Sequence, residues 1–436
     1  MSEVKVNKIS PRSGTTVTLG DSGDTFTVPS GATFDASNAT TTLPSTVVTT
    51  TGTQTLTNKT IDASQLTGTI TPSDATVTPA KLDYNYNQYR NIFINGDMSI
   101  AQRGTSASSL TSSGYYTVDR FQTIIGSQGT WTQSQSTDVP SGQGFATSLK
   151  MDCTTADASP SASDRLVVRQ LFEGQNLQYL KKGTANAISL TASFWVKSTK
   201  TGTFIVELFD VDNQRQISAS YTVNTTNTWE KKTVTFAGDT TGALDNNNGE
   251  SFQINFWLGA GTDFSSGTLN TTWNSNTNAN RAVGQVNIAD STSNDWYITG
   301  VQLEAGTTAS DFEFLPHDVN LQRCWRYFEK IANGGEDPDA VIGSGGYVYQ
   351  TNVLAVNYQW YPKRAAPSIY QTSGTNYFRY QRDGATEDFN SIKIYIPNYL
   401  NGLIYSDDGF TGTSGSNGWV QLNNNSSAYL GLNAEL

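Results

Sequence analysis

The 436-residue sequence predicts a mainly β protein built from three regions. Apolar residues recur in short alternating runs between Gly, Pro, Asn and Ser, a pattern typical of antiparallel strands and turns. Charged residues make up only 15% of the chain, so Thr, Ser, Asn, Gln and Gly supply most of the polar surface. Only the segment after Pro316 has the 3.6-residue periodicity of an amphipathic helix. We expect a β shaft and neck over residues 1–90, a jelly-roll or β-sandwich body over 91–317, and a mostly β terminal domain with one α-helix over 318–436.

The first 85 residues are too poor in large side chains to form a core alone. About a third of them are Thr or Ser, and Phe26 and Phe34 are the only aromatic residues before Tyr84. Backbone ordering costs roughly 1–2 kcal/mol per residue, which so little apolar area cannot offset. The segment is therefore either disordered or intertwined with identical chains, and we favour an elongated, intertwined β shaft. Thr78-Pro79 resembles a helix start, and with the tyrosines up to Tyr89 it predicts a neck.

The body is expected to be an antiparallel sandwich or jelly roll, because about ten short strands follow one another without a convincing helix. The expected strands are Asn91–Ile94, Asp119–Ile125, Phe145–Met151, Arg165–Phe172, Ile188–Lys197, Thr203–Phe209, Ile217–Val223, Glu230–Phe236, Ser251–Leu258 and Trp296–Glu304. Within residues 190–196, every second side chain is expected to face inward, with Trp195 on the opposite face.

The terminal domain is expected to begin with a helix that Asp318 caps and Gly334-Gly335 ends. Its apolar residues would be Leu321, Cys324, Trp325, Phe328 and Ile331. The strands expected after it are Tyr347–Gln350, Val353–Trp360, Tyr377–Tyr380, Ser391–Ile396, Leu403–Tyr405, Trp419–Leu422 and Tyr429–Glu435. His317, between Pro316 and Asp318, is expected to be a hinge residue rather than a catalyst.

Composition excludes several classes of function. A formal charge of −11 argues against binding to nucleic acid, because phosphates need cationic side chains. One His and two Cys are too few for a zinc or haem site, so no cofactor is expected. We expect no secretory signal peptide and no membrane insertion. Cys153 and Cys324 are expected to be free thiols rather than a disulfide, in a protein made in a reducing cytoplasm.

Three groups of motifs resemble the tail fibres of short-tailed bacteriophages, particularly those that infect marine cyanobacteria. Residues 52–61 (GTQTLTNKTI) are similar to a recurrent segment of fibre shafts. Residues 91–104 (NIFINGDMSIAQRG), with Val118-Asp119-Arg120-Phe121, resemble the start of a fibre body. Residues 301–306 (VQLEAG) and 321–328 (LQRCWRYF) resemble its end.

The resemblance implies a homotrimer and a place in the virion. The N-terminal segment would attach to adaptor or nozzle proteins of the tail. The C-terminal tip would bind a surface polysaccharide or an outer-membrane receptor of the host. Three copies of each tip would multiply weak contacts through avidity.

The ends of the body also resemble those of jelly-roll carbohydrate-binding modules. The matching residues are Asn95-Gly96-Asp97 and Gln302-Leu303-Glu304. Such modules often hold a structural calcium ion near these ends. Of its ligands, only Asp97 is carried over here, because Ser99 stands where the next acidic residue is usual.

Aromatic residues concentrate in the terminal domain, where 12 of the 20 tyrosines lie in the last 118 residues. Tyr and Trp offer large, stiff contact surfaces, although aromatic residues also favour strands for structural reasons alone. Loops and turns are the places where we expect receptor contacts. The candidate receptor-binding residues are Tyr377, Arg379, Tyr380, Arg382, Tyr399 and Trp419.

We expect no enzymatic activity. A fibre-borne polysaccharide depolymerase is an alternative, since a glycosidase needs two carboxylates at a defined separation. The acids available in the terminal domain are Asp383, Glu387, Asp388, Asp407 and Asp408. A purely structural tail component, whose tip contacts another tail protein, is a second alternative.

Overall fold

The computed structural model describes residues 89–436, except Ser373 and Ile396, together with short stretches between residues 9 and 33. The chain divides into two units, residues 1–84 and 85–436. The predicted shaft and the neck up to residue 88 otherwise lie outside the described residues, so the intertwined shaft stays a prediction.

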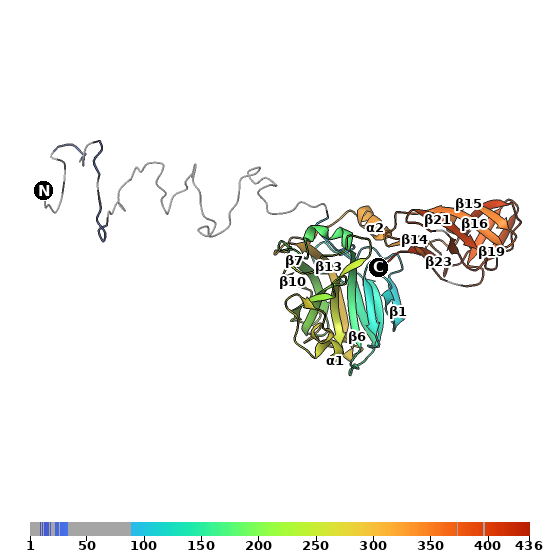
Figure 1. Cartoon of the computed structure of the whole chain (residues 1–436), viewed down its shortest axis with the longest axis horizontal. Helices are drawn as coiled ribbons and strands as arrows, with labels where there is room; N and C mark the ends of the chain where they lie inside the picture. The colour runs from blue at the N-terminus through green and yellow to red at the C-terminus, as the bar shows by residue number, and fades with distance from the viewer. Residues whose placement is uncertain are drawn as a thin grey trace. The chain divides into compact units, whose positions relative to one another are not determined.

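The body is a sandwich of two antiparallel sheets, as the alternating strands predict (Figure 1). The six-stranded sheet has the order β1 (Ser106–Leu110), β4 (Thr130–Ser136), β5 (Ser148–Thr155), β13 (Asp295–Ala305), β7 (Leu190–Ser198) and β10 (Glu230–Phe236). The seven-stranded sheet has the order β12 (Asn274–Ser275), β9 (Arg215–Val223), β8 (Gly202–Asp210), β11 (Glu250–Ala260), β6 (Arg165–Glu173), β3 (Gln122–Gly126) and β2 (Gly114–Tyr115). The short helix α1 (Thr262–Ser265) follows β11, and single 3-10 turns occupy Gly174–Asn176, Gln178–Leu180, Asn278–Asn280 and Ile288–Asp290.

The body core lies between these two sheets. Phe194 of β7 meets Phe256 of β11 edge to face, with ring centroids 5.1 Å apart. The inward alternation predicted for residues 190–196 is confirmed, because Leu190, Ala192, Phe194 and Val196 belong to this core, whereas Trp195 lies outside it and is half-buried. Aromatic pairs of this kind stabilise a core beyond the area that they bury.

The terminal domain has a second core and two further antiparallel sheets (Figure 1). The three-stranded sheet has the order β14 (Phe328–Asn333), β23 (Tyr429–Asn433) and β17 (Ser368–Gln371). The seven-stranded sheet has the order β19 (Ala385–Phe389), β18 (Phe378–Arg382), β22 (Asn417–Leu422), β15 (Val341–Gln350), β16 (Val353–Gln359), β21 (Asn401–Ser406) and β20 (Lys393–Tyr395). Leu430 of β23 and Val420 of β22 both belong to the core, so each sheet contributes to it.

The helix predicted after Pro316 is confirmed, but it is shorter than its apolar spacing suggests. Helix α2 spans His317–Trp325, and Phe328 and Ile331 belong to strand β14 instead. Phe328 pairs with Asn433 of β23, a partner that is distant in the sequence. Asp318 is not the cap: Pro316 occupies that position with extended backbone, and Asp318 lies in the first turn. There its carboxylate still interacts favourably with the positive end of the helix dipole.

The strand predicted over residues 91–94 is wrong. This segment is irregular, and the left-handed backbone of Asn95 (φ 62°) and Met98 (φ 61°) interrupts any ladder. Asn95 also makes side-chain hydrogen bonds with both the N–H (2.9 Å) and the carbonyl (2.9 Å) of Ile100, which closes a loop. Strands β1, β2, β4, β12, β14, β17 and β19 were not expected from the sequence.

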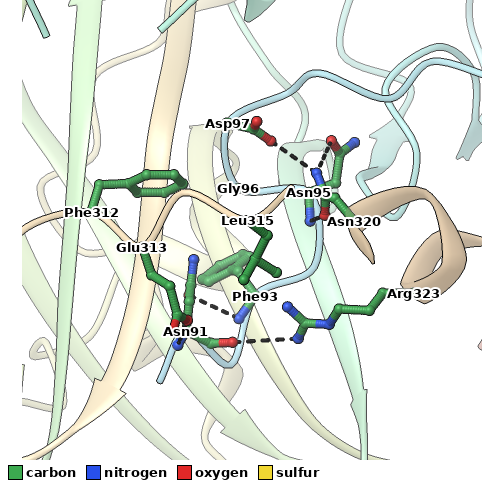
Figure 2. Close-up of a pocket in the computed structure, with 10 residues that line it drawn as sticks. All are labelled: Asn91, Phe93, Asn95, Gly96, Asp97, Phe312, Glu313, Leu315, Asn320 and Arg323. Carbon is green, nitrogen blue, oxygen red and sulfur yellow. Dashed lines mark hydrogen bonds between the residues drawn. The ribbon is translucent and has the colours of Figure 1, made fainter. Parts of the chain in front are cut away.

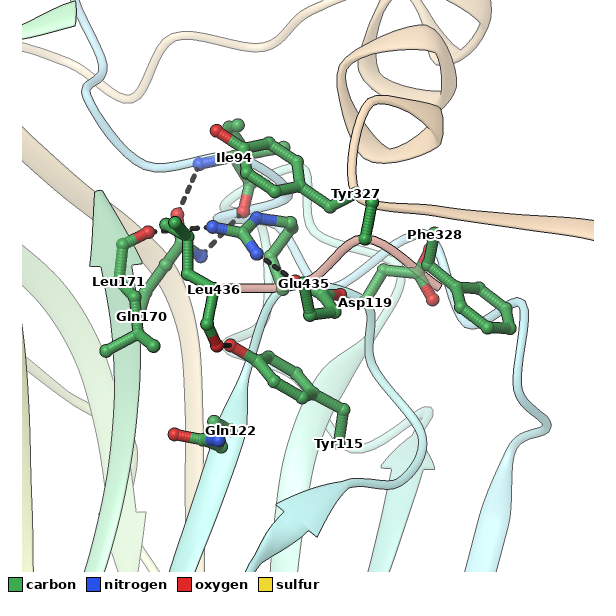
Figure 3. Close-up of polar contacts among 12 residues, drawn as sticks. Ile94, Tyr115, Asp119, Gln122, Gln170, Leu171, Tyr327, Phe328, Glu435 and Leu436 are labelled. Carbon is green, nitrogen blue, oxygen red and sulfur yellow. Dashed lines mark hydrogen bonds and ion pairs between the residues drawn. The ribbon is translucent and has the colours of Figure 1, made fainter. Parts of the chain in front are cut away.

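The terminal domain and the body contact each other through charges buried on both sides. Arg120 of the body pairs with Glu435, and neither side chain is more than 3% exposed. The Arg120 guanidinium also lies over the Tyr327 ring, 3.4 Å from its centroid. Tyr327 and Glu435 converge on this point in Figure 3. Nearby, Arg326 donates two hydrogen bonds (2.7 and 2.6 Å) to the carboxylate of Glu173, which also accepts one from the Tyr327 hydroxyl at 2.5 Å.

Cys153 and Cys324 are both free and buried, which confirms the prediction of unpaired thiols. Burial raises the pKa of Cys153 to about 11 and raises that of Cys324 as well. Among the described residues, no helix has the length and apolar character needed to cross a bilayer.

Candidate functional site

The strongest candidate for a binding surface is the outer face of the seven-stranded sheet in the terminal domain. Side chains alternate across this sheet, so buried residues mark its inner face. In β22, Val420 is buried, whereas its neighbour Trp419 is 37% exposed. In β15, the buried Val348 stands between Tyr347 (45% exposed) and Tyr349 (65% exposed). The outer face therefore presents large aromatic side chains to solvent.

The strand register gathers these aromatic residues in adjoining rows. Tyr347 of β15 lies opposite Ala355 of β16, which lies opposite Tyr405 of β21. Tyr405 in turn lies opposite Lys393 of β20, and its ring meets that of Tyr395 edge to face at 6.2 Å. We define the open face as the residues Tyr347, Tyr349, Tyr395, Tyr405 and Trp419. Tyr and Trp provide large, stiff contact surfaces, and they are enriched among the residues that contribute most of the free energy of binding at protein interfaces.

Ion pairs lie at both edges of the open face. Arg379 of β18 donates from Nε to Oδ1 of Asp388 (2.8 Å), and this hydrogen bond raises the pKa of Arg379. At the other edge, Lys393 pairs with Asp407, whose hydrogen bond raises the pKa of Lys393. Because both pairs are partly exposed, a ligand can displace one partner without leaving an uncompensated charge in the protein interior.

The structure divides the six candidate receptor-binding residues among different environments. Trp419 belongs to the open face, and Arg379 lies on the same side of the sheet, because its opposite residue Gln421 has the same orientation as Trp419. Tyr399 is 57% exposed but lies between β20 and β21, across the sheet from β18. The six residues therefore do not form one site.

Tyr380 is a wrong candidate, because it is fully buried in the core of the terminal domain. Its ring packs edge to face against Phe410, with centroids 5.7 Å apart. Tyr377 packs against the same core and is only partly accessible. Arg382 donates hydrogen bonds to Glu387 (3.2 Å) and Thr413 (3.2 Å), so its side chain stabilises local structure within the terminal domain. Alternation within β18 separates Tyr380 from Arg379, which the sequence had grouped together.

The acidic residues that a depolymerase would need are mostly tied into local structure. Asp388, Glu387 and Asp407 form ion pairs with Arg379, Arg382 and Lys393, respectively. Hydrogen bonds from Ser391 (2.8 Å) and Asn390 (3.2 Å) lower the pKa of Asp408, which is opposite to the shift that a general acid needs.

Asp97 lies in a small crevice of about 10 Å³ between the start of the body and α2 (Figure 2). Its Oδ1 accepts hydrogen bonds from Ser99 Oγ (3.0 Å) and Asn320 Nδ2 (3.1 Å). Asn320 Oδ1 accepts from the backbone of Asn95 at 3.1 Å, so the amide of Asn320 turns its donor, not its oxygen, toward Asp97. Calcium takes six to eight oxygen ligands, and this donor set does not fit it. No group of three or more His, Cys, Asp or Glu suited to a metal occurs among the described residues.

The tyrosines of β15, β20 and β21 were missed in the choice of candidates. Their signal was present as alternation: Tyr347-Val348-Tyr349 places two aromatic residues on one face of a strand and an apolar residue on the other. The sequence could not show which of the two faces would be covered by a second sheet.

Comparison with known proteins gives the following likenesses. No protein-family model and no curated protein matches the chain. Solved structures with detectable similarity include the enzymatically active domain of tailspike protein 4 from bacteriophage CBA120 (14% identity, TM-score 0.27). The match covers 50% of this chain and 22% of the tailspike chain. The chain thus spans about a fifth of that protein's length.

Two further structures are matched over nearly their whole length. One is a putative sugar-binding protein from Bacteroides thetaiotaomicron (10% identity, TM-score 0.27, covering 49% of this chain and 99% of that one). The other is the C-terminal family 22 carbohydrate-binding module of Clostridium thermocellum Xyn10B (11% identity, TM-score 0.27, 51% and 99%). TM-scores of this size do not establish a shared fold, so the assignment of the body as a β-sandwich rests on its strands and their pairing.

Proposed function

We propose that this protein is a tail fibre of a short-tailed bacteriophage, a virion component that binds the host cell surface through its terminal domain. It is a homotrimer, and its N-terminal segment attaches to adaptor or nozzle proteins of the tail. The receptor is a surface polysaccharide or an outer-membrane protein of the host. The fibre-like motifs around residues 52–61, 91–104 and 301–328 support the assignment to this class.

The observation that carries the proposal is the open face. Exposed Tyr347, Tyr349 and Trp419 stand on neighbouring strands that a buried core holds rigid. A rigid aromatic surface loses little conformational entropy on binding. Three copies in one fibre need only weak individual affinity, because the second and third contacts form at high effective concentration. The proposed action is adhesion, with no covalent step.

Binding of the labelled full-length chain to cells of marine cyanobacteria, measured by flow cytometry, tests this proposal. Replacement of both Tyr347 and Tyr349 by Ser should reduce binding at least tenfold on a strain that the unmodified chain binds. Tyr361→Ser is the matched control, since Tyr361 is exposed but lies outside the open face. Equal loss in the control, or no loss in the double variant, would contradict the role of the open face.

The two alternatives predict different results in the same experiment. A depolymerase would release reducing ends from host polysaccharide, and this release would stop in Asp383→Asn and Glu387→Gln variants. A structural tail component would bind no host strain in any panel, while still assembling with tail proteins. We expect neither outcome.

A further inference from the structure

A cleft of about 160 Å³ lies on the outer face of the seven-stranded body sheet, on the side away from the core. In β11, Gln253, Asn255 and Trp257 line the cleft, while the residues between them, Ile254 and Phe256, belong to the core. The full lining is Ile124, Arg165, Val167, Arg169, Phe209, Gln253, Asn255, Trp257 and Arg281. The cleft belongs entirely to the body, so it is separate from the open face.

Cationic groups dominate this cleft, although the whole chain carries a formal charge of −11. Three of its nine lining residues are arginines: Arg165, Arg169 and Arg281. Burial lowers the pKa of Arg169, and the like charges of Arg281 and Arg165 add to this effect against the opposing charge of Glu250. Arg165 is exposed, but partial desolvation and the charge of Arg281 lower its pKa as well. The protein therefore holds like charges together at an energetic cost.

Arg281 is neutralised within the protein, whereas the other two arginines are not. Glu207 is fully buried beneath the cleft, and its carboxylate accepts two hydrogen bonds from Arg281, at 2.7 and 2.9 Å. Arg165 and Arg169 form no ion pair with any described residue. The cleft thus keeps two positive charges that form no direct ion pair among those residues, although the charge of Glu250 still acts on Arg169.

Arg169 is positioned by neutral side chains. Its Nε donates to Gln122 Oε1 (2.7 Å), and its Nη1 donates to Gln253 Oε1 (3.1 Å). A guanidinium has five N–H donors, and Nη2 of Arg169 makes no hydrogen bond to a described residue. An amide that holds an arginine fixes its direction without cancelling its charge. This arrangement leaves a preorganised donor for an anionic ligand.

An unused acceptor accompanies these donors. Asn255 Nδ2 donates to Glu207 Oε2 (3.0 Å) and Gln253 Oε1 (3.3 Å), which sets the orientation of the amide. Its Oδ1 accepts no hydrogen bond from a described residue, and this oxygen is not completely buried, so a ligand can reach it. A ligand that carries an anionic group and a hydroxyl group a few ångströms apart would satisfy both Arg169 and Asn255.

We propose that the body cleft binds an acidic sugar of a polysaccharide, with its carboxylate or sulfate on Arg169 and Arg165 and a hydroxyl group on Asn255. The site is distinct from the open face, so the fibre carries two kinds of binding surface. Glu207 is a positioning residue, because it holds Arg281, Asn255 and the indole N–H of Trp257 (3.2 Å) and lies beneath the ligand.

Isothermal titration calorimetry of the full-length chain tests the proposal with four probes: oligoguluronate, dextran sulfate, neutral dextran and poly-glutamate. We expect binding of at least one acidic polysaccharide that weakens as NaCl is raised, and no binding of neutral dextran. The oligoguluronate and dextran sulfate arms distinguish a carboxylate from a sulfate. Preference for poly-glutamate over both would overturn the assignment to a sugar, and binding of dextran would overturn the assignment to an anion.

Variants locate the site. Arg169→Gln and Arg165→Gln should each weaken binding of the acidic polysaccharide at least tenfold. Lys231→Gln removes the same charge from the exposed edge of β10 and should change affinity less than twofold. Arg165 is exposed, so its replacement leaves folding intact even if Arg169→Gln does not fold. Equal affinity in Arg165→Gln and Lys231→Gln would overturn the proposal. The Tyr347 and Tyr349 double variant should bind the polyanion normally, which separates this result from the test of the open face.

Discussion

At the scale of single residues, burial determines what a charged side chain does in this protein. Arg120 and Glu435 are both almost completely buried, and Glu435 also pairs with the buried Arg103 at 3.5 Å, so removal of its carboxylate would leave two buried cations without their counter-ion. Lys393 and Asp407 form a pair of the same chemistry at the surface of the terminal domain, with side chains 47% and 38% exposed. Water already solvates the second pair, so its loss is inexpensive.

We predict that Glu435→Gln lowers the free energy of unfolding by about 3–5 kcal/mol, because Arg120 loses its buried counter-ion. Asp407→Asn, the control, should lower it far less, because water already solvates both partners of this pair. Urea denaturation of the full-length chain at one fixed protein concentration measures both values. A cost for Glu435→Gln no larger than that of the control would show that the buried pair does not hold the two domains together.

At the scale of elements, a bulge in β13 shapes the start of the body. The pairing of β13 with β7 shifts register between Thr299 and Gln302, where Gly300 adopts a left-handed backbone (φ 61°). A Cβ at Gly300 would lie 2.5 Å from the ring of Phe145. The bulge directs the carbonyl of Val301 toward the Asn91 side chain, whose Nδ2 donates to it at 3.0 Å. A local break in the ladder therefore anchors the irregular segment that replaces the expected first strand.

We predict that Gly300→Ala destabilises the protein by about 1–3 kcal/mol more than Gly142→Ala does. Gly142 has a similar backbone (φ 72°) with no atom within 4 Å of an added Cβ, so it isolates the cost of the left-handed conformation. The excess at Gly300 arises from overpacking against Phe145. Thermal unfolding followed by circular dichroism compares the two, and equal midpoints would refute the packing argument.

At the scale of the whole molecule, two separate cores underlie the two proposed binding surfaces. The body closes its core between two sheets and leaves an arginine-lined cleft on an outer face. The terminal domain closes a smaller core and leaves an aromatic face open. The first 85 residues lack the apolar area for a core of their own, so we expect them to order only by self-association.

We predict that the full-length chain has a native mass three times the 47.2 kDa of one chain, measured by light scattering coupled to size exclusion. Residues 89–436 alone should contain fewer copies per particle, because the intertwined shaft is what holds the chains together in the proposed trimer. A stable monomer of the full-length chain, with a single cooperative unfolding transition, would be incompatible with the proposed trimer.

Strand existence was predictable wherever periodicity was strong, and least so where a partner decided the conformation. Residues 190–196 alternate cleanly, and β7 forms there as expected. Phe328 and Ile331 also continue the period of α2, yet pairing with β23 makes them a strand. Of the predicted receptor-binding residues, Trp419 is accessible whereas Tyr380 is buried, because strand alternation alone does not say which face a second sheet covers.

The sequence by itself determined the class of this protein: mainly β and acidic, with free thiols. It also predicts an N-terminal stretch that cannot build a core alone. These properties follow from composition and from periodicity, which act locally along the chain. Only the tertiary structure decided which sheet faces stay open, that Arg165 and Arg169 share a cleft with Arg281, and that Glu435 pairs with Arg120. Those outcomes depend on strands that meet from distant parts of the chain, and burial and electrostatics act between them only after they have met.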